Sequence, residues 1–281
     1  MPRKRAIVVG TDFSAASQHA VARAASIARQ QGATLHVVHA ASRLPRFLAK
    51  QLAVDASEGE RSERTALETV LEELRAKGTS ARGHLTPGNA APVLRKKARE
   101  VGAGMIVVGS RGRSFAVAIL GSTAERVVDG KGPPVLLVRE TKTRAYHEVI
   151  VAIDADSDIQ RAVDAATFAA KDVEPSLLHA FSGPFENKLV LQGVGAAAIR
   201  RYRDHSREEA RALLEPRLVA AGIDPSSLRL VHGNRRLVLV EAAIAGNLLV
   251  LDRSDSAARH MLVGSVSRWV IEHSATDILL V

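Results

Sequence analysis

The apolar residues of this chain form short, nearly uninterrupted runs that alternate with longer stretches of helical spacing. The runs, such as 6–9 and 105–108, are rich in Val, Ile and Leu, as expected of strands that are buried on both faces of a sheet. The stretch 67–74 places apolar residues at i, i+3, i+4 and i+7, one stripe of a helix, and Gly78 can end that helix. Strict alternation of strands and helices predicts a parallel sheet covered by helices on both faces.

The same order of strands, turns and helices occurs twice along the chain. The strand, Asp, turn and helix that begin at Ala6 are matched by those that begin at Val149, and later landmarks follow in the same order at nearly one offset. The Gly-Asn pair at 88–89, for example, reappears at 233–234. This repetition predicts a duplicated fold, with one domain at residues 1–143 and a second at residues 144–281.

Composition narrows the class of protein. The chain has 281 residues, 46% hydrophobic and 25% charged, which suits two globular domains of ordinary size. It has no cysteine, which excludes disulfides and cysteine-ligated metals and fits a reducing compartment. No apolar run approaches the 18 residues of a membrane span, and the N-terminus does not resemble a secretory leader. We therefore expect a cytoplasmic protein with no membrane partner.

The net charge of +9 raises the question of nucleic-acid binding. The arginines are scattered over the helical stretches, and aromatic residues make up only 3% of the chain, so the stacking platform of a single-strand binder is missing. The charge therefore favours solvated helix faces over a nucleic-acid partner.

Glycines follow the strand 105–108 in a way that suits an anion. Gly109 and Gly112 come directly after the strand, and Gly121 precedes a Ser-Thr pair that opens the next helix. Unpaired amide N–H groups and the helix dipole attract negative charge there, and glycine lets the backbone approach a phosphate closely. Ser122 and Glu125 have the spacing of a capping box for that helix.

Each of these residues also has a structural interpretation. The two glycines can simply mark a tight turn, and the chain contains neither a Walker A motif nor a dinucleotide fingerprint. Arg111 and Arg113 can reach phosphate oxygens or remain exposed loop arginines. Asp12 can accept a hydrogen bond from a ribose or an adenine, or it can be the N-cap of the first helix, and Asp154 would then be a cap without a ligand.

The repeat resembles the universal stress protein family in its tandem form, over essentially the whole chain. The family's hallmark is G-x2-G-x9-G-[ST] after the fourth strand, with an Asp after the first strand. The resemblance implies two Rossmann-like α/β domains of the adenine nucleotide alpha hydrolase-like type, each with a five-stranded parallel sheet in the order 3-2-1-4-5. It also implies an ATP or AMP site, with Mg²⁺ as an optional companion, at Thr11, Asp12, Ala40, Val108, Gly109, Arg111, Gly112, Arg113, Gly121, Ser122 and Thr123.

The sequence departs from this hallmark in two places. Eight residues rather than nine separate Gly112 from Gly121, so the phosphate loop is one residue short. The second half keeps Gly264 but carries Asp252 and Asp255 at the positions of the first two glycines. A carboxylate about 4 Å from a phosphate oxygen would cost roughly 4 kcal/mol at an effective dielectric of 20. We therefore expect nucleotide binding in the first half only.

Two histidines and two connecting segments have other interpretations. His39 and His179 occupy equivalent positions of the repeat, which favours a packing role at a strand end. The basic and apolar segment 43–50 can bind a partner or a membrane surface, but it more commonly covers the core of its own domain. Its counterpart at 183–201 is predicted to be an irregular connection.

These observations predict a stress-response regulator that binds an adenine nucleotide and is not an enzyme, since no base or nucleophile can be assigned. The two domains are expected to pair through their fifth strands, 135–138 and 278–281, as an internal pseudo-dimer. A ligand-free scaffold for an unknown protein partner is the alternative. The stress, the partner and any further homodimer stay open.

Overall fold

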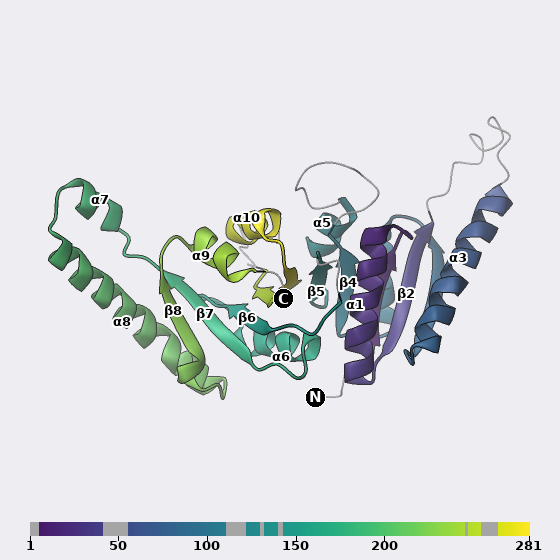
Figure 1. Ribbon diagram of the computed structural model, residues 1–281, viewed down its shortest axis with the longest axis horizontal. Coiled ribbons are helices and arrows are strands. Elements are labelled where there is room, and N and C mark those ends of the chain that lie inside the picture. Colours follow the sequence, from purple (N-terminus) through teal and green to yellow (C-terminus); the bar gives the residue numbers. More distant parts are fainter. Residues whose placement is uncertain are drawn as a thin grey trace.

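All the described strands join in one continuous sheet of ten strands. The computed structural model describes residues 6–41, 56–110, 122–129, 132–139, 143–244, 247–253 and 264–281. The strand order is β3-β2-β1-β4-β5-β10-β9-β6-β7-β8, and every neighbouring pair is parallel except β5 with β10 (Figure 1). The predicted order 3-2-1-4-5 is therefore confirmed in each half.

The described part of the first half alternates strands and helices. Its elements are β1 (Ala6–Thr11), α1 (Ala15–Gln31), β2 (Thr34–Ala41), α3 (Ala56–Ala76), β3 (Ala81–Pro87), α4 (Ala90–Glu100), β4 (Met105–Gly109), α5 (Ser122–Val128) and β5 (Val135–Val138).

The second half repeats this order of strands and helices. Its elements are β6 (Glu148–Ala152), α6 (Ile159–Ala169), β7 (Pro175–Phe181), α7 (Glu186–Leu191), α8 (Ala196–Ala220), a 3-10 turn (Pro225–Ser227), β8 (Leu228–His232), α9 (Arg235–Ala242), β9 (Asn247–Leu251), α10 (Ser265–His273) and β10 (Asp277–Leu280). The segment 183–201 is thus not irregular, because it forms α7 and the start of α8.

Helices cover both faces of the sheet, and each face has its own apolar core. One core contains α1 and α3 with their counterparts α6 and α8, and the other contains α4 and α5 with α9 and α10. Successive strand residues point to opposite faces, so Val9 and Val37 join the first core while Val8 and Val38 join the second. This two-sided burial explains why the strands are continuous apolar runs.

The two halves meet where β5 runs antiparallel to β10. Leu136 lies opposite Leu279, and these two residues occupy the same position of the repeat, so the local two-fold axis passes through this pair. The predicted pairing of the two fifth strands is present. It buries the edge strand of each half and gives the chain one sheet instead of two.

Candidate functional site

The carboxyl ends of β1, β2 and β4 are neighbours, which brings several predicted site residues to one edge of the sheet. Thr11 pairs with His39 across β1 and β2, and the register of β1 with β4 extends toward Gly109. Asp12 follows β1 directly, and Ala40 is half-buried near the end of β2. Ligands of open α/β sheets bind at this kind of edge, where the strand order reverses.

The turn after β1 is fixed by a small hydrogen-bond network. The Oδ1 atom of Asp12 accepts from the backbone N–H of Ser14 at 3.0 Å and from its hydroxyl at 2.5 Å. The Thr11 and Ser17 hydroxyls lie 3.2 Å apart. Ser14, not Asp12, is the N-cap of α1, and its Oγ accepts from the N–H of Ser17 at 3.3 Å. The cap prediction for Asp12 is therefore wrong, because Asp12 orients the residue that makes the cap.

This network keeps Asp12 ionised. Partial burial acts to raise the pKa of its carboxyl, but hydrogen bonds from the Ser14 side chain and backbone outweigh burial and hold the pKa below its ordinary value. Both Ser14 contacts are made with the Oδ1 atom, and the Ser17 hydroxyl also favours the charged form of the carboxyl.

Phe13 has an unusual backbone conformation in the same turn. Its φ is +62°, the one positive value at a non-glycine residue in the described part of the chain. The Phe13 ring centroid lies 4.5 Å from that of His39.

The two equivalent histidines make the same backbone contact in each half. The Nδ1 atom of His39 is 2.8 Å from the Thr11 carbonyl oxygen, and the Nδ1 atom of His179 is 3.0 Å from the Ile153 carbonyl oxygen. The two histidines therefore tie the second strand of each half to the first.

Gly109 has a packing reason to be glycine. A Cβ atom at this position would lie 2.8 Å from the carbonyl oxygen of Ala16, so only glycine lets the first turn of α1 approach β4 this closely. In the second half, Asp252 takes this position, and α6 begins five residues after Asp154, whereas α1 begins three residues after Asp12. The later helix start fits the bulkier side chain.

The remaining predicted residues divide into described and undescribed positions. Val108 is buried in the core beneath α4 and α5. Ser122 is the first residue of α5, and Thr123 is exposed in its first turn. Arg111, Gly112, Arg113 and Gly121 lie outside the described residues, as do Asp255 and the whole segment 43–50.

At the equivalent edge of the second half, the acid after the first strand forms an ion pair. Arg235, the first residue of α9, binds the carboxylate of Asp154. Burial acts to raise the pKa of Asp154, but the Arg235 guanidinium outweighs it and holds the pKa below its usual range. Asp154 is not a helix cap, because Asp158 caps α6. The first-half residue equivalent to Arg235 is Ala90, which directly follows the repeated Gly-Asn pair.

The turn after β9 connects the two halves. The guanidinium of Arg253 donates to the Pro133 carbonyl at 2.9 Å and lies 3.4 Å from the Gly132 oxygen, both in the first half. The carbonyl of neighbouring Asp252 lies 3.4 Å from the hydroxyl of Ser267. The second-half turn thus holds the connection between α5 and β5.

Glu125, the acid of the expected capping box of α5, also contacts the other half of the chain. Glu125 accepts from Arg268 at 3.0 Å, and these two residues occupy nearly the same position of the repeat. Its carboxylate therefore points to α10 of the other half. The Ser-x-x-Glu spacing predicted the start of the helix correctly.

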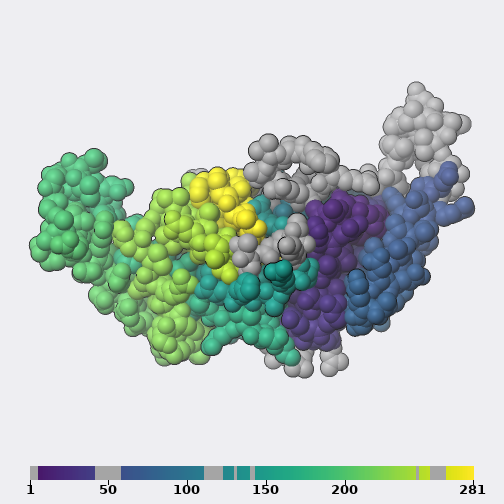
Figure 2. All heavy atoms as spheres, in the orientation of Figure 1, coloured from purple at the N-terminus to yellow at the C-terminus, as the bar shows by residue number. Residues whose placement is uncertain are grey.

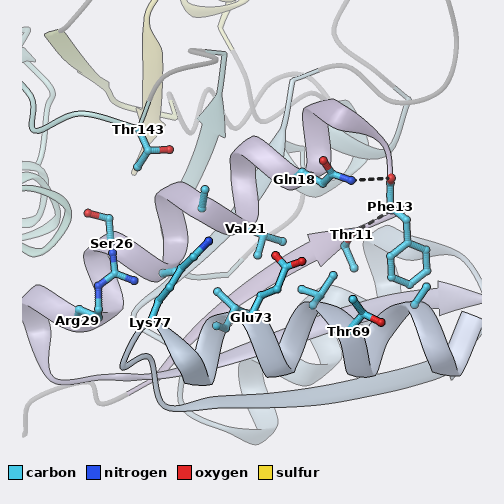
Figure 3. A pocket seen from close by; sticks show the side chains of 15 residues that line it. Thr11, Phe13, Gln18, Val21, Ser26, Arg29, Thr69, Glu73, Lys77 and Thr143 are labelled. Atoms are coloured by element: carbon cyan, nitrogen blue, oxygen red, sulfur yellow. Dashed lines mark hydrogen bonds between the residues drawn. The ribbon is translucent and has the colours of Figure 1, made fainter.

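A hollow lies between α1 and α3. It has a volume of about 590 Å³, and Figure 3 shows Glu73 and Lys77 reaching into it from the α3 side while Phe13 closes one end. Val21 and Leu74 contribute apolar surface. The hollow contains Thr11 but none of the other predicted nucleotide residues, so it is distinct from the sheet-edge site.

The described residues were also searched for a metal site and for a membrane-spanning helix. There, no three His, Asp or Glu side chains gather in a way that could hold a metal ion. Among the same residues, no helix is both long and apolar enough to cross a membrane.

Sequence analysis missed two differences between the halves, although each is visible when the two repeats are aligned. Arg235 stands where the first half has Ala90, immediately after an aligned Gly-Asn pair. Arg253 stands where the first half has Ser110. A large cation in place of a small residue at an aligned turn indicates a filled site, but only the structure identifies what each cation binds.

Comparison with known proteins settles the family. The Universal stress protein family profile matches residues 4–139 and again residues 145–281. The chain belongs to the universal stress protein family. No curated protein matches the sequence.

Solved structures agree with the tandem fold. A universal stress protein from Archaeoglobus fulgidus DSM 4304 has a TM-score of 0.66 at 20% identity, covering 99% of this chain and 96% of its own. A putative universal stress protein from Pseudomonas aeruginosa UCBPP-PA14 has a TM-score of 0.64 at 16% identity, covering 99% and 92%. A universal stress protein solved in complex with cAMP covers 50% of this chain and 99% of its own, at 28% identity and a TM-score of 0.39.

Proposed function

We propose that this universal stress protein is a stress-response regulator that binds an adenine nucleotide, ATP or AMP, at the sheet edge of its first half only. Asp12 and Ala40 would contact the nucleoside, and the turn after β4 together with the start of α5 would face the phosphates. These roles rest on the family resemblance and on the placement of Thr11, Asp12 and Gly109 along one edge. Binding, rather than catalysis, is the proposed role.

The difference between Ala90 and Arg235 carries the proposal. In the second half, the Arg235 guanidinium occupies the edge and binds Asp154. In the first half, a half-buried methyl side chain stands at that position, so the Arg235 guanidinium has no counterpart there. The first-half edge therefore lacks the ion pair that engages the equivalent carboxylate, Asp154, in the second half.

The test is a titration of the full chain with ATP or AMP, in the presence and absence of Mg²⁺, followed by thermal stability and calorimetry. We expect a single site, with about 2.7 kcal/mol of stabilisation at 100 times the dissociation constant. Ala90→Arg should abolish the stabilisation by supplying the cation that closes the second half. The matched variant Arg235→Ala should leave it unchanged.

A second pair of variants tests the phosphate side. Gly121→Asp should remove the nucleotide effect because it places a like charge near the phosphates, whereas Gly264→Asp should not. Two bound nucleotides per chain, or unaltered binding by Ala90→Arg, would contradict the proposal. If millimolar nucleotide gives no effect on the unaltered chain, the ligand-free scaffold becomes the better function.

A further inference from the structure

The helix α7 and the start of α8 form a lobe that projects from the second half. Figure 1 shows α7 beyond the end of the sheet, and Figure 2 shows the green lobe standing clear of the surrounding surface. Three large apolar side chains lie on it in the open: Phe185 is 64% exposed, Val190 is 53% exposed and Leu191 is 87% exposed. Val190 and Leu191 are adjacent in the chain, and grouped exposed apolar residues mark interaction sites.

The lobe is held in place by buried polar contacts. Glu186, at the start of α7, is only 8% exposed, and its carboxylate binds Arg203 of α8 at 2.5 Å and His232 of β8 at 2.6 Å. Burial acts to raise the pKa of Glu186, but these two partners outweigh it and hold the pKa below its ordinary value. A charged anchor of this kind fixes the direction of α7, so the apolar side chains are presented outward by the fold itself.

The segment that carries these apolar side chains is also rich in exposed cations. Lys188, Arg200 and Arg201 are all exposed, and the stretch from residue 187 to residue 203 contains no Asp or Glu. Glu186, the acid that precedes this stretch, is buried and paired. The lobe therefore combines exposed apolar side chains with exposed positive charge.

We propose that this lobe docks the protein onto the surface of an anionic lipid membrane. Apolar side chains that enter the boundary between headgroups and acyl chains, with flanking Lys and Arg on lipid phosphates, are the two components of peripheral membrane binding. A projecting tip suits this partner better than a protein, because stable protein interfaces need about 800 Å² of matched surface on each side. A contact of this type requires no membrane-spanning helix.

The experiment is co-sedimentation of the full chain with phosphatidylcholine vesicles and with vesicles that also contain phosphatidylglycerol. We expect at least tenfold stronger binding to the anionic vesicles, weakened by added salt. Leu191→Asp should reduce binding at least tenfold, and Arg200→Gln with Arg201→Gln should remove most of the preference for anionic lipid. The matched control is Leu213→Asp, since Leu213 is also exposed, at 52%, but lies farther along α8.

Three results would overturn the proposal. The first is no binding to anionic vesicles by the unaltered chain. The second is equal binding by Leu191→Asp and Leu213→Asp. The third is concentration-dependent self-association, abolished by Leu191→Asp and with no vesicle binding, which would make the lobe a contact between copies of this chain. Circular dichroism of each variant verifies that the helices remain folded.

Discussion

Arg23 and Asp277 form a buried ion pair that neither half of the chain can make alone. The Nε atom of Arg23 on α1 lies 3.0 Å from Oδ2 of Asp277 on β10, and the side chains are 3% and 0% exposed. Tyr146 donates its hydroxyl to the same oxygen at 2.9 Å, and its ring lies 4.2 Å from the guanidinium. The repeat position equivalent to Asp277 is Pro134, so the local two-fold axis does not duplicate this pair.

Loss of the Asp277 charge should weaken the joined structure strongly. Asp277→Asn keeps the side-chain size but leaves the Arg23 guanidinium buried without its counter-ion, so we expect the free energy of unfolding to fall by about 3–5 kcal/mol. Urea unfolding followed by circular dichroism measures this change. The double variant Arg23→Met with Asp277→Leu should be more stable than Asp277→Asn, because it removes both charges; a double variant that is no better would contradict this explanation.

Gly109 should tolerate no side chain, with or without nucleotide. The added methyl of Gly109→Ala would meet the backbone of Ala16 at 2.8 Å, so we expect about 1–3 kcal/mol of destabilisation in the absence of any ligand. The control is Gly59→Ala in α3, where nothing lies within 4 Å of the new methyl group. That variant should be stabilised by about 1 kcal/mol, because alanine favours a helix. Thermal unfolding of both variants decides between packing and ligand binding as the reason for Gly109.

The pair of His36 and His84 should make stability fall in mild acid. His36 Nδ1 lies 2.9 Å from His84 Nε2, and burial followed by the neighbouring positive charges lowers the pKa of His36 from 6.5 to about 4. The unfolded chain then binds more protons between these two pH values, so stability rises with pH across this window and is complete above it. The change in the free energy of unfolding across this pH window should approach about 3 kcal/mol.

Replacement of His36 measures this contribution. His36→Gln should flatten the dependence of unfolding free energy on pH between 6.5 and about 4, compared with the unaltered chain. The exposed His205 on α8 serves as the control, and His205→Gln should leave the slope unchanged. Equal slopes for all three proteins would show that the buried pair does not titrate differently on unfolding.

The first half alone should dimerise. A fragment of residues 1–143 exposes the edge of β5, and the local two-fold axis through Leu136 and Leu279 means that a second copy can present Leu136 in place of Leu279. Sedimentation velocity should show a dimer weaker than the joined halves, because the fragment has no counterpart of Asp277 for Arg23. A fragment that stays monomeric at high concentration would show that strand pairing depends on that ion pair.

The sequence by itself determined the repeated architecture. Apolar runs with two-sided burial identified the strands, helical stripes such as 67–74 identified the helices, and the constant offset between repeats predicted a duplicated sheet order. These features are local or periodic, so they can be recognised from the order of residues along the chain. The start of α5 at Ser122 and the equivalence of His39 and His179 were predicted for the same reason.

Tertiary structure decided what each conspicuous side chain contacts. Asp12 and Asp154 look alike in sequence, yet the first binds Ser14 within its own turn and the second binds Arg235 from another helix. Glu125 has the spacing of a cap, and its carboxylate binds Arg268 of the other half. Arg235 and Arg268 lie tens of residues or more from their acidic partners along the chain, and the free energy of a charge depends on the groups around it in three dimensions. Spacing predicted where the turns lie, and only packing determined which charged groups meet at them.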